Sequence, residues 1–229
     1  MQEILYLDYG LETAKISVIP NGLTDLAKKK SVEGLRKKWN LSGREKIILF
    51  AGRMDEIKGV EYLIKAFREL LKVYPQCRLV IAGSGSFDQY TKESQDICTK
   101  ITYTGFLEKS QIHEWYCLSD VGVVPSLFEP FGYVAVEMMM HRLPLVVTAT
   151  SGLNEVVDDT CGLKVPLTIL SDKVEIDTTL LAQKILYLLQ HPAEARKLGR
   201  NGRKRYLKEY TLEIFRRNML DFYSSLFMR

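Results

Sequence analysis

Short apolar runs alternate with longer amphipathic segments between residues 46 and 165. The longer segments have helical spacing, as in the positions of Leu63, Phe67 and Leu70. The pattern predicts strands over 46–51, 78–82, 101–104, 121–124, 145–147 and 162–165, helices over 59–74, 110–118, 134–140 and 153–157, and a polar helix after Gly85. Strands that alternate with helices and read as apolar on both faces indicate an α/β fold, a Rossmann-like parallel sheet with helices on both faces.

Other elements are predicted on either side of this region. Residues 15–19 have the pattern of a strand that ends in a turn at Pro20, Asn21 and Gly22, and residues 32–39 that of a lysine-rich surface helix. Helical spacing returns at the other end of the chain, over 177–189, 193–210 and 212–227. The sheet should therefore carry a C-terminal helical extension.

Composition excludes several classes of protein. The 229 residues are 46% hydrophobic and 26% charged, which is ordinary for a globular chain with an ample core. The net charge of +4 gives little support to nucleic-acid binding. No apolar run reaches the roughly 18 residues that span a bilayer, and no signal peptide is evident at the start. We therefore expect a cytoplasmic location.

Cysteines and histidines give no sign of a metal centre. The sequence contains no C-x-x-C pair, and no histidine stands at metal-ligand spacing from a cysteine. We expect reduced, mostly structural thiols and no bound metal. The residues concerned are Cys77, Cys98, Cys117, Cys161, His113, His141 and His191.

Two glutamates follow the predicted strand that ends at Val124. Glu129 lies on the loop and Glu137 about two helical turns later, so both can face the crevice at the carboxyl end of a parallel sheet. Gly132 precedes the helix, whose free N–H groups and positive dipole end suit a phosphate. The alternative is that both acids are solvated side chains. On this stretch alone the two interpretations are equally weighted.

Two cations follow the first strand of the alternating region. Arg53 and Lys58 flank the start of a helix, where positive charge is unfavourable unless an anion lies between them. A planar guanidinium and a mobile ammonium can together hold a diphosphate. The alternative is again a pair of solvated loop ends.

These motifs together resemble retaining glycosyltransferases of group 1, the GT4-like type with the GT-B fold. The resemblance covers nearly all of the chain after residue 15, and the glutamates eight positions apart, taken with Arg53 and Lys58, are its most specific part. The matching segments are Ile19-Pro20-Asn21-Gly22, Phe50-Ala51-Gly52-Arg53, Lys58-Gly59, Val80-Ile81-Ala82-Gly83-Ser84-Gly85, Thr104-Gly105-Phe106 and Glu129-Pro130-Phe131-Gly132.

The resemblance implies a domain that binds a nucleoside diphosphate sugar. By position, Arg53 and Lys58 are implied as the diphosphate clamp, and Glu129 as the residue that binds hydroxyls of the donor sugar; these three are the implied catalytic residues. Glu137 is implied to hold the ribose. The other implied donor-binding residues are Gly83, Gly105, Phe106, Phe131, Gly132, Tyr133 and Val134. No metal cofactor is implied. UDP is the first expectation for the nucleotide, with GDP and ADP as alternatives.

The chain departs from the family pattern in two ways. His141 and Arg142 stand where the family usually has a glycine at the end of the helix, so we expect a different cap or a strained Arg142. The length fits only one of the two Rossmann-like domains of a GT-B enzyme. We therefore expect an interdomain linker over 1–14, the donor-binding domain over 15–210, and a final helix over 211–229 that contacts a missing N-terminal acceptor-binding domain.

Three functions remain open at this point. The leading hypothesis is the donor half of a retaining glycosyltransferase that acts on a saccharide or lipid-linked acceptor and is inactive without its other domain. The alternatives are an epimerase-like GT-B domain and a non-catalytic nucleotide-binding module. A secondary expectation is peripheral contact of the basic segment 193–210 with anionic lipid at the inner membrane face.

Overall fold

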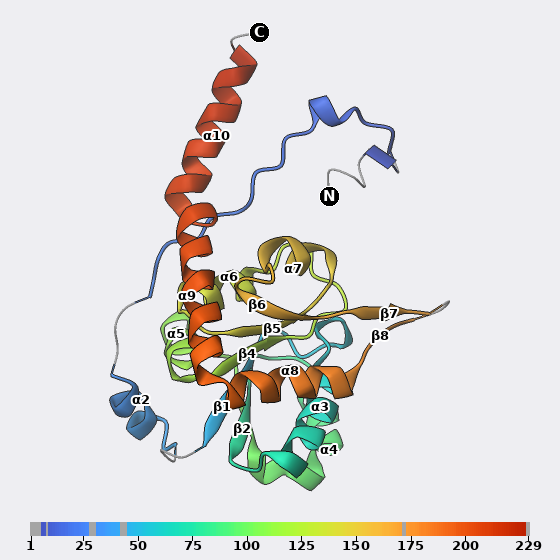
Figure 1. The fold of residues 1–229 in the computed structure, drawn as a ribbon, viewed down its shortest axis with the longest axis vertical. Helices are drawn as coiled ribbons and strands as arrows, with labels where there is room; N and C mark the ends of the chain where they lie inside the picture. Colours follow the sequence, from blue (N-terminus) through green and yellow to red (C-terminus); the bar gives the residue numbers. More distant parts are fainter. Residues whose placement is uncertain (1–5, 8, 28–30, 42–44, 171–172, 228–229) are drawn as a thin grey trace. The chain divides into compact units, whose positions relative to one another are not determined.

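The computed structural model describes residues 6–7, 9–27, 31–41, 45–170 and 173–227 (Figure 1). The chain forms two compact units, one of Leu26–Arg203 and one that joins Met1–Asp25 to Lys204–Arg229. The larger unit contains the whole parallel sheet.

A six-stranded parallel sheet with the order β3-β2-β1-β4-β5-β6 forms the centre of the larger unit. This order is that of a doubly wound Rossmann-type sheet, so the predicted α/β class is confirmed. The strands are β1 (Lys46–Ala51), β2 (Cys77–Ala82), β3 (Ile101–Gly105), β4 (Val121–Val124), β5 (Leu145–Thr148) and β6 (Gly162–Val165).

Helices cover both faces of the sheet (Figure 1). Strands β2 and β3 are added on one side of β1, and β4, β5 and β6 on the other. Because the crossovers are right-handed, α3 lies on one face of the sheet, and α5 and α6 lie on the opposite face. The helices of this unit are α2 (Val32–Lys38), α3 (Val60–Val73), α4 (Phe87–Glu93), α5 (Lys109–Leu118), α6 (Tyr133–Met140), α7 (Ser151–Val156), α8 (Thr178–Gln190) and the first part of α9 (Pro192–Glu209), with 3₁₀ turns η2 (Glu56–Lys58) and η3 (Gln95–Lys100).

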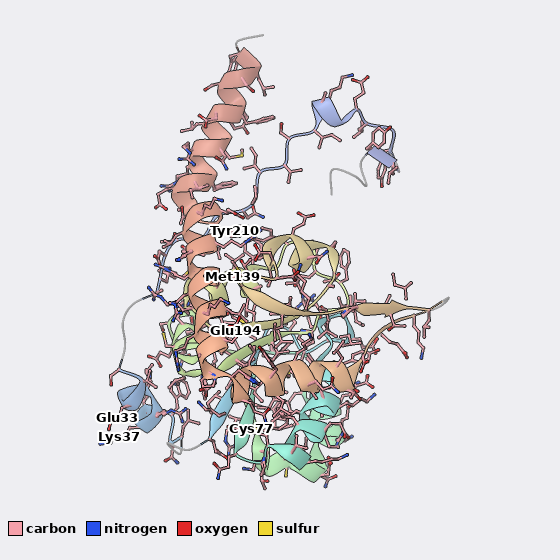
Figure 2. All side chains as sticks on the ribbon, viewed as in Figure 1. Glu33, Lys37, Cys77, Met139, Glu194 and Tyr210 are labelled. Atoms are coloured by element: carbon pink, nitrogen blue, oxygen red, sulfur yellow. The ribbon has the colours of Figure 1, made fainter. Side chains whose placement is uncertain are left out.

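The core lies between the sheet and the helix pair α3 and α8. Ile48, Phe50 and Ile81 of the strands pack in one buried cluster with Leu63 and Phe67 of α3. These are the helix positions that the spacing predicted. Cys77 is buried at the start of β2 (Figure 2), and burial raises the pKa of its thiol to about 12, so it is a structural thiol as expected.

The end of α6 bears out the expectation for Arg142. This residue has a φ of 60°, the left-handed conformation that usually belongs to glycine. Its N–H donates to Met139 O at 3.0 Å, and the next N–H, of Leu143, donates to Met138 O at 3.1 Å. These two bonds are those of a Schellman cap, formed here around an arginine. Met139, at the end of this helix, is labelled in Figure 2.

The smaller unit contains α10 (Leu212–Phe227), the last part of α9 and the 3₁₀ turn η1 (Thr13–Lys15). The predicted strand over 15–19 is wrong: these described residues form no strand, and an isolated bridge joins the later residue Leu23 to Thr211. The Leu23 N–H donates to Tyr210 O at 2.8 Å. An apolar run becomes a strand only where another strand pairs with it, and this segment has no such neighbour among the described residues.

Sequence patterns did not predict two strands. The segments β7 (Leu167–Ile169) and β8 (Val174–Ile176) pair antiparallel and form a two-stranded sheet of their own. Each has only three residues, which is too short for a recognisable alternation.

Candidate functional site

The candidate site lies at the point in the parallel sheet where the strand order reverses. Strands β1 and β4 are neighbours there, and ligands of open α/β sheets bind in the crevice outside the carboxyl ends of such strands. The loops after these two strands are joined by a hydrogen bond from the Leu127 N–H to Ile57 O at 2.8 Å. The sequence predicted that residues of both loops would meet at this edge.

A cavity of about 320 Å³ opens at this edge. Five of the residues predicted for the site line it, and they come from the loops after β1, β2 and β3 and from α6: Arg53, Gly83, Phe106, Val134 and Glu137. The lining thus includes a guanidinium, a carboxylate and an aromatic ring. Phe106 is 73% exposed, so its ring is available to a planar ligand group.

Asp55 organises the loop that carries the two cations. Its Oδ1 accepts the Lys58 backbone N–H at 3.0 Å, and its Oδ2 lies 3.2 Å from Nη2 of Arg53. Asp55 was not among the predicted residues. The sequence could have indicated this role, because an aspartate three positions before Lys58 is typical of a helix N-cap.

Lys58 and Glu129 form an ion pair. The Lys58 Nζ lies 2.7 Å from Glu129 Oε2, and the side chains are 21% and 15% exposed. Removing one partner of a pair this buried leaves an uncompensated charge, whereas an exposed pair contributes little. The structure therefore brings together a predicted phosphate-binding residue and a predicted sugar-binding residue, from loops 71 positions apart.

The start of α6 offers backbone donors beside this pair. Gly132 has a φ of 103° and no side chain caps the helix. A Cβ placed on Gly132 would lie 3.8 Å from Glu129 Cγ, so the helix N-terminus is close to the ion pair. The first-turn N–H groups and the dipole favour an anion at this position. Phe131 and Tyr133 stack edge to face at 4.9 Å and, with Gly132, do not line the cavity itself.

Glu137 lines the cavity from the second turn of α6. Its Oε2 accepts a hydrogen bond of 2.7 Å from the Tyr116 hydroxyl. Burial raises the pKa of the Glu137 carboxyl, and the Tyr116 hydrogen bond and the charge of Lys109 oppose that rise. The predicted ribose-binding residue is thus a half-buried carboxylate with one oxygen already engaged.

Two glycines shape the loops after β2 and β3. The Gly83 N–H donates to Gly105 O at 3.0 Å. Gly83 has a φ of 145°, and a Cβ at this position would stand 1.8 Å from the carbonyl oxygen of Gly52. Only glycine lets the loops after β1 and β2 approach this closely, so Gly83 sets the width of the cavity. Gly105, with a φ of 67°, turns the chain into Phe106 without lining the cavity.

The described residues contain neither a metal-binding cluster nor a membrane-spanning helix. No group of three or more histidine, cysteine, aspartate or glutamate side chains in that part of the chain could hold a metal ion. Among the same residues, no helix combines the length and the apolar character that crossing a membrane requires.

The profile of the family described as glycosyl transferases group 1 matches residues 31–205. The chain therefore belongs to this family. It is 36% identical over 155 residues to an uncharacterised glycosyltransferase of Methanocaldococcus jannaschii, an alignment that covers 62% of this chain and 38% of the relative. The chain spans about half the length, or less, of the curated relatives that it matches.

Solved structures give the same fold. Sucrose-phosphate synthase from Thermosynechococcus elongatus superposes with a TM-score of 0.82 at 30% identity, over 99% of this chain and 57% of that one. Anabaena HepE, solved in complex with UDP, has a TM-score of 0.82 at 21% identity, over 98% of this chain and 61% of that one. The Rossmann-like fold of the GT-B type is thereby confirmed.

Proposed function

We propose that this chain contains the donor-binding domain of a retaining glycosyltransferase, which transfers a sugar from a nucleoside diphosphate sugar to a saccharide or lipid-linked acceptor. Two observations at the same edge of the sheet carry the proposal: Arg53 and Glu137 line one cavity, and the Lys58–Glu129 pair, which does not line it, joins the loops after β1 and β4. Membership of the group 1 family supports it independently.

The diphosphate is assigned to the two cations and the start of α6. Arg53 reaches the cavity with a side chain that is 75% exposed, and Asp55 holds it beside the Lys58 loop. Backbone N–H groups of Gly132, Tyr133 and Val134 supply further donors in this scheme. A phosphate that binds Lys58 shares that ammonium with Glu129 and so lies next to the carboxylate assigned to the sugar.

The two glutamates are assigned to different hydroxyl-bearing groups. A carboxylate can accept hydrogen bonds from two hydroxyls at once, which suits Glu129 to the donor sugar and Glu137 to the ribose diol. Phe106, with Gly83 and Gly105, is assigned to the side of the base. UDP is the first candidate, because the structural neighbour HepE was solved with UDP.

The protein's catalytic task in this scheme is to stabilise the leaving group. The bond between the anomeric carbon and the phosphate oxygen breaks, and negative charge grows on the diphosphate beside Arg53 and Lys58. The acceptor oxygen bonds to the same face of the anomeric carbon, and its proton passes to the departing phosphate. Neither glutamate needs to act as a nucleophile.

The acceptor side belongs, in this proposal, to a second domain. Residues 1–14 act as the linker, 15–210 as the donor-binding domain, and 211–229 as a helix that docks on the acceptor-binding domain. The exposed apolar side chains of α10, which include Leu220 at 67% and Phe227 at 89%, support this docking. The 229-residue chain is expected to bind nucleotide and transfer no sugar alone.

Isothermal titration of UDP, GDP and ADP tests the assignment. Loss of a charged hydrogen-bonding partner should weaken the preferred diphosphate about 10- to 100-fold in Arg53→Ala and Lys58→Ala. Lys72→Ala is the matched control, because Lys72 is exposed on α3 and pairs only with Glu69 in the described contacts. An affinity for the nucleotide that is unchanged in both Arg53→Ala and Lys58→Ala would refute the proposal. Binding without transfer, even with the acceptor domain restored, would favour a non-catalytic module.

A further inference from the structure

Tyr116 of α5 is the hydrogen-bond partner of the Glu137 carboxylate. It is only 2% exposed, yet it lines the same cavity as Arg53 and Glu137. Its hydroxyl donates to Glu137 Oε2 at 2.7 Å. No sequence motif singled out α5, since Tyr116 reads there as an ordinary core position.

The surroundings hold the phenol ring in place. The ring of His113 lies edge-on to Tyr116 at a centroid distance of 5.6 Å, and the ring of His141 lies at 5.3 Å. His141 also binds the α6 backbone, with its Nδ1 at 2.9 Å from Glu137 O. Glu137 is thus fixed through its side chain by α5 and through its carbonyl by the end of α6.

A half-buried carboxylate needs such support. Desolvation favours its neutral form, in which one oxygen becomes an O–H donor and the hydrogen bonds accepted from hydroxyls lose their charge assistance. The Tyr116 hydroxyl and the charge of Lys109 both favour the ionised form of Glu137. The other titratable or charged groups that face this region are His113 on α5, His141 at the end of α6 and Arg53 on the loop after β1.

We propose that Tyr116 is a positioning residue for ribose recognition. Its hydroxyl engages Oε2 of Glu137 and leaves Oε1 free to accept hydrogen bonds from a vicinal diol, so that the pair selects ribonucleotides over 2′-deoxyribonucleotides. This inference rests on the proposed function, because it takes the cavity to bind a nucleoside diphosphate. A ligand without the 2′-hydroxyl presents one donor fewer to the carboxylate and gains less from its fixed position.

The test compares UDP with 2′-deoxy-UDP. Titrations are made with the wild type, Tyr116→Phe, Glu137→Ala and the double variant, and with Tyr187→Phe as the matched control on the half-exposed face of α8. Tyr116→Phe should weaken UDP about threefold to tenfold and 2′-deoxy-UDP less, which lowers the preference for ribose. In the Glu137→Ala background, Tyr116→Phe should change UDP affinity less than twofold.

The pH dependence of UDP affinity distinguishes this role of Tyr116 from a purely structural one, which would leave the dependence unchanged. Since Tyr116 favours the ionised carboxylate, the acidic loss of UDP affinity should begin at higher pH in Tyr116→Phe than in the wild type. Equal weakening of both nucleotides, an unmoved profile, or further weakening in the Glu137→Ala background would overturn the role of Tyr116 alone. Absence of UDP binding by the wild type would overturn the proposed function and this inference with it.

Discussion

Arg142→Gly is expected to stabilise the larger unit. Arg142 holds a left-handed conformation at the end of α6, with a φ of 60°. Its side chain is exposed and makes no hydrogen bond or ion pair with the residues that the structure describes. Glycine keeps the two backbone bonds of the cap and removes the contact between Cβ and the following carbonyl oxygen.

Two opposing terms set the magnitude. The left-handed conformation costs a residue with a Cβ about 1–2 kcal/mol. Glycine, in turn, gives the unfolded chain additional entropy, which lowers stability by about 0.4–1 kcal/mol. The net gain should be near 1 kcal/mol. For a domain of this size, that corresponds to a rise in Tm of about 2–4 °C.

Thermal and urea unfolding of matched variants provide the assay. Asn40→Gly is the control, because Asn40 also has a positive φ, of 52°, but asparagine tolerates this conformation. Arg142→Gly should raise Tm and the control should not. A variant less stable than the wild type, or an equal gain in Asn40→Gly, would refute the explanation by backbone strain.

The remaining predictions concern the site. Burial raises the pKa of the Glu137 carboxyl above its ordinary value, so the cost of ionising this buried group lowers the stability of the fold as pH rises through the raised pKa. Glu137→Gln should therefore raise Tm at pH 7 and leave it unchanged at pH 4, and an equal rise at both would contradict this. Glu129→Gln should lower the affinity for UDP-glucose towards that for UDP, as measured by titration; an unchanged preference for the sugar nucleotide would exclude Glu129 from sugar binding. Gly59→Ala should cost more than about 2 kcal/mol in urea unfolding, because its Cβ would stand 1.9 Å from Pro125 O. Gly34→Ala, whose Cβ would meet nothing nearer than 3.6 Å, is the control and should stabilise α2.

The order of strands and helices along the chain could be predicted because periodicity is a local property. The strand from Lys46 to Ala51 is buried almost throughout. Its nearly continuous run of apolar residues indicates a strand covered on both faces. The strand expected over 15–19 failed for the opposite reason. Strand formation there depends on a distant partner, which no local pattern reports.

The site was predictable to a similar extent. Arg53 and Glu137 could be placed because residues at the carboxyl ends of parallel strands meet at one edge. The pairing of Lys58 with Glu129 depends on side-chain conformations of two loops, and the partnership of Tyr116 with Glu137 on how α5 packs against α6. Neither contact leaves a periodic trace in the sequence. Both required the structure.

A crystal structure of the chain with UDP would test the central claim most directly. The diphosphate should contact Arg53, Lys58 and the N–H groups at the start of α6, and the ribose hydroxyls should contact Glu137. Phe106 should lie beside the base. UDP bound away from this crevice, or with its ribose on the side of Lys58 and its phosphates at Glu137, would contradict the assignment of the site.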